Sequence, residues 1–429
     1  MTTFLQVFMR IIIFLLLHLT TQSFSQTSVQ EIPQFIWMNN KAELLHLRNC
    51  IERSDELGLK QEEYDVDFID AFINNIPELT NFTDSVAAES KLTQIAISFF
   101  SDIIYGKLPI ITYNGINYSP DCIPLADTIN KAVNDHSFNV LLGNLECKAP
   151  EYISLKSSLS NLADSLGMTP GSDRKRISTL EKKISSVVSA LNTVRWMNCL
   201  IARNEYTIVV NVPSASLLLY NRNKIIFESR VIVGTRSTRT PLFISNLTDV
   251  TIYPYWNVPK SIAVKELLPM IKKDISYLEN NNFQILNKYG KVIDPYGLDW
   301  DSMNEKNFSY SIRQSTGCDN SLGLIKLNIN HPNNIYLHDT PWKILFESAN
   351  RFYSHGCIRV EKAKDLAHII LKENSMAVDT LKENENTTSH NPVVLRVDKN
   401  IPVLVLYNTA WFNAEGEIRF YPDIYSKFK

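Results

Sequence analysis

The sequence predicts an α+β protein in which a mainly helical N-terminal part precedes a β-rich C-terminal domain with a helical insert. Two observations predict this division. Apolar residues recur at helical spacing before about residue 196, and β-branched runs dominate from Thr207 onward. The 429 residues, 45% of them apolar, are enough for two or three domains with a buried core.

The first 25 residues are expected to be an export signal that is not part of the fold. Arg10 precedes an apolar run at residues 11–17, and Ser23-Phe24-Ser25 supplies the small residues of a cleavage site. A membrane span needs about 20 apolar residues, and this run has about half that number. The sequence therefore predicts an exported protein.

The mature chain is expected to contain three consecutive parts. Residues 26–175 form a helical domain, and the polar break at 168–176 separates it from a connecting helix at 176–204. Residues 205–429 form the β-rich domain, with strands expected at 207–212, 216–220 and 225–234 and a turn at Asn221–Lys224. The helical insert is expected within about residues 255–310, beginning near Pro259-Lys260-Ser261.

Charge and cysteine usage exclude some classes of function. The formal net charge is -2 and no basic stripe is present, so we expect no nucleic-acid partner. The six cysteines form no CxxC pair, which argues against a zinc site or a dense disulfide framework. If Cys357 is kept free for chemistry, the other five cannot all pair within one chain, and their pairing stays open.

Two short stretches, Ile335–Pro341 and Ser354–Val360, contain the residues with the clearest potential for chemistry. His338 and Cys357 are the candidate base and nucleophile, because a thiol becomes reactive when a nearby histidine takes its proton. Either the Asp339 carboxylate or its backbone carbonyl is expected to orient the histidine ring. This pattern indicates a cysteine acyltransferase or hydrolase.

The residues around Cys357 are expected to support the reaction. Gly356 allows the backbone to approach a substrate closely, and successive N–H groups of His355, Gly356 and Cys357 are expected to face a developing oxyanion, with Ser354 beside them. A helix expected at residues 361–373 would stabilise the thiolate through its dipole. His355 is also a candidate second catalytic histidine.

The two stretches together resemble the signature of the L,D-transpeptidases, which carry a YkuD-type catalytic domain. That signature is a histidine, a spacer near fifteen residues, and then Ser/Thr-His-Gly-Cys; here the spacer is residues 339–353. The rest of the chain resembles the large periplasmic branch of this family, which has an N-terminal scaffold domain. Segments that carry this wider resemblance are Phe35-Ile36-Trp37, Asn257-Val258-Pro259 and Asn408-Thr409-Ala410-Trp411. The usual peptidoglycan-binding domain is replaced by the short break at 168–176.

The resemblance implies an enzyme of the bacterial periplasm or cell envelope that forms 3→3 cross-links in peptidoglycan. Its partners are then a donor tetrapeptide stem and an acceptor amine, it uses no metal or organic cofactor, and carbapenem β-lactams are expected to inhibit it. Two alternatives stay open. One is an L,D-carboxypeptidase, in which water resolves the acyl-enzyme, and the other is a non-catalytic wall-binding protein.

Three further residues are candidates for substrate binding, each with a structural alternative. Arg359 suits a substrate carboxylate, or else a salt bridge to Glu361 or Asp365. Tyr336 is expected on the same strand face as His338, where it lines the donor pocket or packs in the core. Trp256 is expected to line the cleft from the insert or to pack in the insert's own core.

Overall fold

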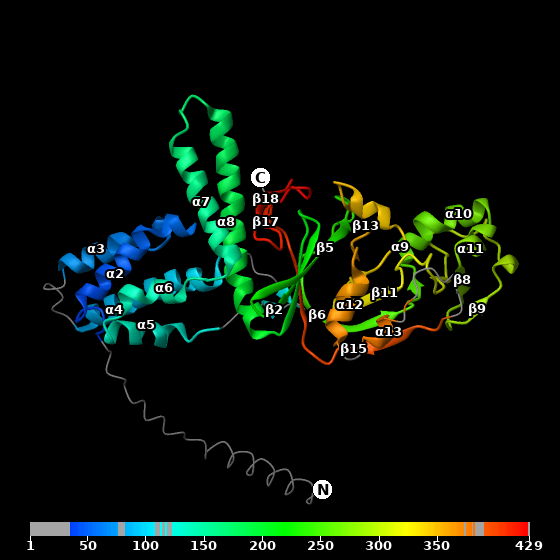
Figure 1. Ribbon diagram of the computed structural model, residues 1–429, viewed down its shortest axis with the longest axis horizontal. Helices are drawn as coiled ribbons and strands as arrows, with labels where there is room; N and C mark the ends of the chain where they lie inside the picture. The colour runs from blue at the N-terminus through cyan, green and yellow to red at the C-terminus, as the bar shows by residue number, and fades with distance from the viewer. Residues whose placement is uncertain are drawn as a thin grey trace, which may run out of the picture.

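The computed structural model describes residues 35–75, 82–107, 112–113, 116–117, 122–372, 375–379, 381 and 390–427, and the expected export signal lies outside them. A helical N-terminal part precedes a β-rich domain, as Figure 1 shows, so the predicted fold class is confirmed. Within the described ranges, no helix is long and apolar enough to cross a membrane.

The N-terminal part is a group of helices around an aromatic core. Trp37 and Phe138 are fully buried, with ring centroids 5.6 Å apart. The buried Glu89 carboxylate accepts the backbone N–H groups of Trp37 and Met38, at 3.0 and 2.6 Å. The elements are α2 (Lys41–Glu52), η1 (Ser54–Leu57), η2 (Gln61–Glu63), α3 (Val66–Asn75), α4 (Phe82–Tyr105), β1 (Thr112–Tyr113), β2 (Ile116–Asn117), α5 (Leu125–Asn134), η4 (Phe138–Val140) and α6 (Leu141–Leu145).

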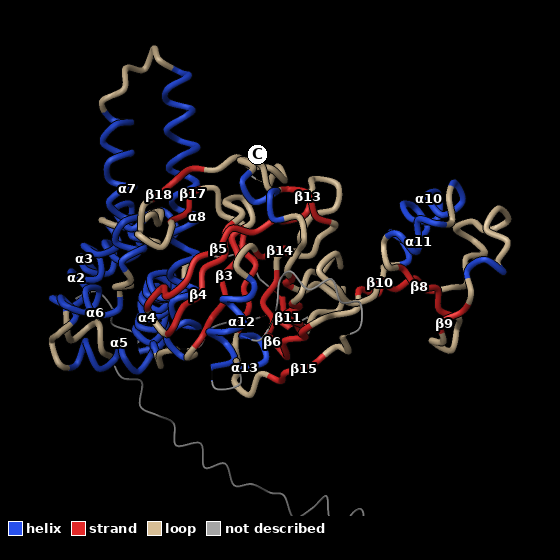
Figure 2. Tube along the Cα trace, turned by 45° about the vertical axis from the view of Figure 1, so that its right-hand side comes forward, coloured by secondary structure: helices blue, strands red, loops and turns tan. Residues whose placement is uncertain are grey.

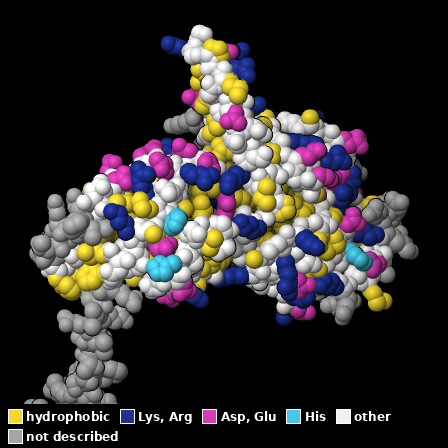
Figure 3. Space-filling view, turned by 60° about the vertical axis from the view of Figure 1, so that its left-hand side comes forward, with side chains coloured by type: hydrophobic (Ala, Val, Ile, Leu, Met, Phe, Trp, Pro, Cys, Tyr) yellow, Lys and Arg dark blue, Asp and Glu magenta, His cyan; other side chains and the backbone are white. Residues whose placement is uncertain are grey.

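Two long helices, α7 (Pro150–Gly167) and α8 (Arg174–Arg203), form a hairpin whose tip stands clear of the rest of the surface (Figure 3). Pro150 occupies the first turn of α7, where its missing N–H costs nothing, and the Asp173 side chain caps α8 by accepting the Arg176 N–H at 3.0 Å. The polar break predicted at 168–176 is this tip. The C-terminal half of α8 is buried between the N-terminal helices and the sheet.

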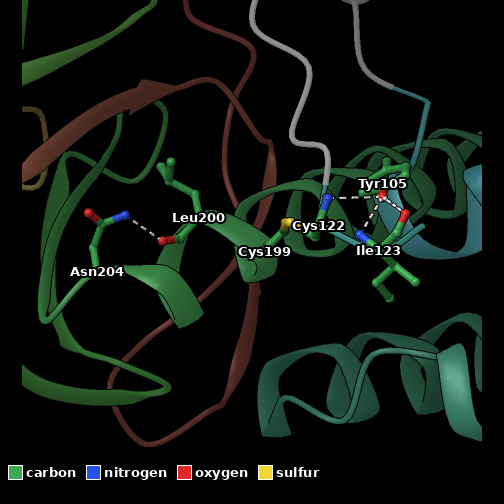
Figure 4. Close-up of a disulfide and its surroundings, with 6 residues drawn as sticks. All are labelled: Tyr105, Cys122, Ile123, Cys199, Leu200 and Asn204. Atoms are coloured by element: carbon green, nitrogen blue, oxygen red, sulfur yellow. Dashed lines mark hydrogen bonds between the residues drawn. A yellow bond between two sulfur atoms is a disulfide. The ribbon is translucent and has the colours of Figure 1, made fainter. Parts of the chain in front are cut away.

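A disulfide between Cys122 and Cys199 joins the segment before α5 to helix α8, with the Cα atoms 6.2 Å apart (Figure 4). The hydroxyl oxygen of Tyr105 fixes the same segment by accepting the Cys122 and Ile123 N–H groups, at 3.1 and 3.2 Å. Cys50, Cys147, Cys318 and Cys357 are not part of a disulfide. The pairing that the sequence left open is therefore one disulfide between the N-terminal part and α8.

The β-rich domain is built on a ten-stranded sheet in the order β11-β12-β14-β5-β4-β3-β16-β6-β15, with β13 beside β5. A further pairing of β11 with β6 closes the sheet on itself around an apolar core. The predicted hairpin at Asn221–Lys224 is confirmed as the β4–β5 turn. The strands are β3 (Tyr206–Asn211), β4 (Ser216–Asn221), β5 (Lys224–Gly234), β6 (Phe243–Ile252), β11 (Ile325–Ile329), β12 (Leu337–His338), β13 (Phe352–Ser354), β14 (Ile358–Val360), β15 (Val393–Arg396) and β16 (Pro402–Leu406).

A few elements cover this sheet. Helix α12 packs its apolar face on the core, and the β17–β18 hairpin lies against α8. These elements are η7 (Lys343–Glu347), α12 (Ala363–Leu371), α13 (Met376–Asp379), β17 (Ala410–Phe412) and β18 (Ile418–Phe420).

The insert lies to one side of the sheet (Figure 2) and has its own apolar core. It carries the expected helices and, in addition, a four-stranded sheet in the order β7-β10-β8-β9 that extends the insert to Gln314. Its elements are β7 (Trp256–Asn257), α9 (Lys260–Ile262), the π-helix η5 (Ala263–Leu267), α10 (Leu268–Lys273), α11 (Ser276–Asn280), β8 (Phe283–Leu286), β9 (Val292–Ile293), η6 (Pro295–Gly297) and β10 (Ser311–Gln314).

Candidate active site

The parallel pairing of β12 with β14 brings together the two motif segments, Ile335–Pro341 and Ser354–Val360. Leu337 pairs with Ile358 and His338 with Arg359. Because side chains alternate along a strand, Tyr336 and His338 share one face with Cys357 and Arg359. All four line a cavity of about 570 Å³, and the insert supplies its other wall through residues 256–266. A cavity of this size suits the end of a peptide or a small ligand.

His338 is held in one tautomer. Its Nδ1 lies 2.6 Å from the backbone oxygen of Asp339. A carbonyl oxygen only accepts, so Nδ1 carries the hydrogen and Nε2 keeps its lone pair. Burial, together with the charge of Arg359, lowers the pKa of His338 to about 3, which keeps the ring neutral at neutral pH.

The Asp339 carboxylate does not contact this ring. It accepts the Leu324 N–H at 3.0 Å and pairs with Lys343 at 2.5 Å. Of the two groups that the sequence offered for orienting His338, the structure selects the backbone carbonyl.

The Cys357 thiol is a neutral group in a partly buried position. Burial raises its pKa, while a hydrogen bond from the Tyr336 hydroxyl and the charges of Lys326 and Arg359 act in the opposite direction. The sulfur also lies 3.9 Å from the Asn334 carbonyl oxygen. The thiol is therefore mostly protonated near neutral pH, and its proton must leave during the reaction.

The helix expected after the thiol is present as α12, but a strand lies between it and Cys357. Strand β14 follows Cys357 directly, and helix α12 starts only at Ala363 instead of residue 361. The β-branched side chains of Ile358 and Val360 are fully buried against the core, which favours a strand there.

Tyr336 and Trp256 connect the insert to the Cys357 thiol. The Trp256 side chain forms a hydrogen bond with the Tyr336 side chain, which in turn forms a hydrogen bond with the Cys357 thiol. The Tyr336 ring centroid is 5.6 Å from that of His338, in an edge-on arrangement. Trp256 both lines the cavity and packs on the insert core near Phe283, with ring centroids 6.2 Å apart.

Lys326 is a charged neighbour of the site that the motif analysis did not select. It pairs with His338 across β11 and β12, and its ammonium lies 4.3 Å from the Tyr336 ring centroid. Burial lowers its pKa, and its charge lowers the pKa of Cys357. The sequence feature that could have indicated Lys326 is a charged residue within the alternating apolar strand Ile325–Ile329.

The loop before Cys357 differs from the predicted oxyanion hole at one position. Gly356 has φ of 118°, a conformation that other residues rarely adopt. Its N–H donates to the Ser354 hydroxyl oxygen at 3.1 Å, so it does not point at a ligand. The N–H groups of His355 and Cys357 donate no hydrogen bond among the described residues and remain the candidate donors.

Ser354 and two threonines hold this loop in place. The Ser354 hydroxyl donates to the Cys357 carbonyl at 2.5 Å. Thr240 and Thr238 donate to the carbonyls of Gly356 and Ser354, both at 2.9 Å. The threonines follow β5 in the sequence and belong to no motif, so their role is visible only in the folded chain.

Arg359 faces the cavity and forms no salt bridge with any residue that the structure describes. The expected salt bridge to Glu361 or Asp365 is wrong, because Glu361 pairs with Arg230, with Nε–Oε2 at 2.9 Å. The Arg359 Nε is buried and has no hydrogen-bond partner among the described residues. Its guanidinium lies 5.3 Å from the ring centroid of Trp342, and burial lowers its pKa. Such an unpaired buried cation suits an anionic ligand group.

His355 turns toward the insert. Its Nε2 lies 2.8 Å from Oε1 of Glu266 on η5, and both side chains line the cavity. No hydrogen bond joins His355 to the Cys357 sulfur in the described chain, whereas the second catalytic role weighed from the sequence would require proton transfer there.

The neutral state of this thiol predicts a distinctive pH dependence of alkylation. Because its pKa is raised, the rate of iodoacetamide modification at Cys357 should climb about tenfold per pH unit from pH 6 to 8, without a plateau. Peptide mass spectrometry after timed quenching measures this rate at Cys357 separately from the other thiols. A plateau already reached near pH 6 would instead reveal a preformed thiolate–imidazolium pair.

Two parts of the chain match known protein domains. Residues 205–394 match the sequence model of the L,D-transpeptidase catalytic domain (YkuD), and residues 30–159 match that of a Scaffold domain. A relative from Haemophilus influenzae, named "Putative L,D-transpeptidase", is 43% identical over 221 residues, which cover 51% of this chain and 44% of the relative. Residues 205–394 are thus similar to the catalytic domain of the L,D-transpeptidases and residues 30–159 to a scaffold domain, and the resemblance seen in the sequence is confirmed.

Solved L,D-transpeptidases align only loosely with this chain. The enzyme from Mycobacterium smegmatis is 11% identical, with 47% of this chain and 58% of that chain covered and a TM-score of 0.23. L,D-transpeptidase 3 from Mycobacterium tuberculosis, in complex with a faropenem-derived adduct, is 10% identical, with 47% and 60% covered and a TM-score of 0.23. Scores this low support no comparison of site geometry.

Proposed function

We propose that the chain is a peptidoglycan L,D-transpeptidase that forms 3→3 cross-links through a thioester on Cys357. The observation that carries the proposal is the meeting of Cys357 with a neutral, carbonyl-held His338 in one cavity of a domain that matches the family. An unpaired arginine in the same cavity, Arg359, adds a site for an anionic substrate group.

The first half-reaction is acylation. His338 Nε2 takes the Cys357 proton as the sulfur attacks the carbonyl carbon between the L-centre of a diamino acid and the terminal D-alanine of a tetrapeptide stem. The N–H groups of His355 and Cys357 are the candidate donors to the resulting oxyanion. The carbon–nitrogen bond then breaks, His338 returns the proton to the leaving amine, and D-alanine departs.

The second half-reaction transfers the acyl group. A side-chain amine of a second stem attacks the thioester, gives a proton to His338, and forms the new amide as the carbon–sulfur bond breaks. The proton returns to the sulfur, so the enzyme ends as it began. Water in place of the amine makes the same site an L,D-carboxypeptidase.

Arg359 provides a physical reason for recognising the end of a stem. Its guanidinium is partly buried, faces the cavity, and lies two residues after Cys357 in the sequence. The carboxylate of the terminal D-alanine is close to the bond to be cleaved, and a bidentate pair with Arg359 would hold it there. Tyr336 and Trp256 form the adjoining wall.

The remaining parts of the proposal concern domains and location. We propose that the chain divides into an export signal at 1–25, a scaffold domain at 26–175, a connecting helix at 176–204 and a catalytic domain at 205–429. The export signal would direct the enzyme to the periplasm, where its substrate lies. A non-catalytic wall-binding protein is the remaining alternative.

Incubation of the protein with purified muropeptides distinguishes these functions. Disaccharide tetrapeptides should be converted to cross-linked dimers with release of D-alanine, both quantified by liquid chromatography and mass spectrometry. Conversion to tripeptides alone would identify a carboxypeptidase. An unchanged digest, with an enzyme shown to be folded and reduced, would favour the wall-binding protein.

A further inference from the structure

The proposed reaction needs two ligand groups of opposite charge near one thiol. The donor stem ends in a carboxylate, whereas the acceptor is an alkylamine, which is protonated near neutral pH. Among the described residues that line the cavity there is one arginine, Arg359, and one carboxylate, Glu266. The cavity therefore offers a cationic and an anionic group, supplied by the β14 strand and by the insert.

Glu266 reaches the cavity because of how the π-helix η5 packs. Ala263, Val264 and Leu267 of this helix are buried in the insert core, which leaves Glu266 on the side away from it. There its Oε1 meets Nε2 of His355 at 2.8 Å. His355, the partner of Glu266, lies two residues before Cys357, and Arg359 lies two residues after it. The carboxylate of Glu266 and the guanidinium of Arg359 are therefore linked to opposite sides of Cys357 in the sequence.

A purely structural role, as a latch between the insert and the catalytic loop, accounts poorly for this carboxylate. The side chains of His355 and Glu266 are 48% and 51% exposed, and a bond this exposed to solvent holds two segments together only weakly. The bond to His355 also uses only one of the roughly four lone-pair positions of a carboxylate. The others are left for a donor that enters the cavity.

We propose that Glu266, held in place by His355, binds the ammonium group of the acceptor stem and so favours amine over water as the group that resolves the acyl-enzyme. This inference rests on the proposed function. The bound ammonium releases one proton to solvent and then attacks as the neutral amine. Glu266 forms and breaks no covalent bond, and the steps at Cys357 and His338 are unchanged. Glu266 is thus a residue that determines specificity for the acceptor.

The test compares Glu266→Gln with a matched control, Glu305→Gln. The glutamine keeps the size and hydrogen-bonding capacity of residue 266 and removes its charge. Glu305 is an exposed carboxylate of the same insert that does not line the cavity. Three rates are measured for each protein: D-alanine release without acceptor, dimer formation against acceptor concentration, and trapping of the acyl group by hydroxylamine, which is uncharged at the assay pH.

In Glu266→Gln, the acceptor KM for dimer formation should rise about threefold, as expected for the loss of an ion pair made by a half-exposed carboxylate. D-alanine release and hydroxylamine trapping should fall much less, so the ratio of dimer to tripeptide decreases. Glu305→Gln should behave like the wild type.

Two outcomes would overturn the inference while leaving the proposed function intact. One is an unchanged acceptor KM, and the other is an equal loss in all three rates, which a structural latch predicts. A wild-type protein that releases no D-alanine would overturn the proposed function and the inference with it.

Discussion

Replacing Cys357 with alanine should abolish turnover while the fold stays intact. Among the described residues that line the cavity, Cys357 is the only one with a thiol, and loss of a nucleophile costs roughly 10⁴-fold or more in kcat. The fold should survive because the side chain is small and only partly buried. D-alanine release from tetrapeptide stems measures the loss, and circular dichroism checks the fold.

A carbapenem provides a second measurement on the same variant. The strained amide of a β-lactam presents an acyl carbon with a leaving amine, as the stem does, so we expect one mass addition at Cys357 and none in Cys357→Ala. Cys318 is the control thiol, because it is also partly exposed but lies outside the cavity. Activity within tenfold of wild type in Cys357→Ala, or labelling at Cys318, would identify another nucleophile.

Replacing His338 with alanine should reduce acylation by about 10³-fold, within the range for loss of a general base. The thiol has a raised pKa and depends on this base for losing its proton. Single-turnover kinetics of carbapenem acylation isolate this step. The variant should also acylate faster as the pH rises toward 9, because hydroxide then forms the thiolate that His338 no longer provides.

His355→Ala is the matched comparison for His338→Ala. The His355 ring is hydrogen-bonded to Glu266 and not to the sulfur, so the rate of acylation should fall by much less than in His338→Ala. A larger loss in His355→Ala than in His338→Ala would mean that the roles of the two histidines are reversed.

The sequence by itself determined the class of fold and the choice of His338 and Cys357 as the candidate reacting pair. Local patterns were sufficient for this, because helical and strand periodicity are properties of neighbouring residues. His338, Cys357 and the residues around them also lie close together in the sequence, so their spacing is visible without the fold. Gly356 belongs to the same group, since its φ of 118° matches the freedom that glycine alone provides.

Tertiary structure decided the features that depend on partners distant in the sequence. The pKa of His338 is lowered by burial and by Arg359, and the Gly356 N–H is taken by Ser354 once the loop folds. Strand β14 lies between Cys357 and the expected helix, because the side chains of Ile358 and Val360 are buried on the sheet core. Glu266 approaches His355 from 89 residues away, through an insert whose packing no local pattern specifies. Electrostatic and hydrogen-bonding roles follow from such contacts, so they emerge only when the chain is folded.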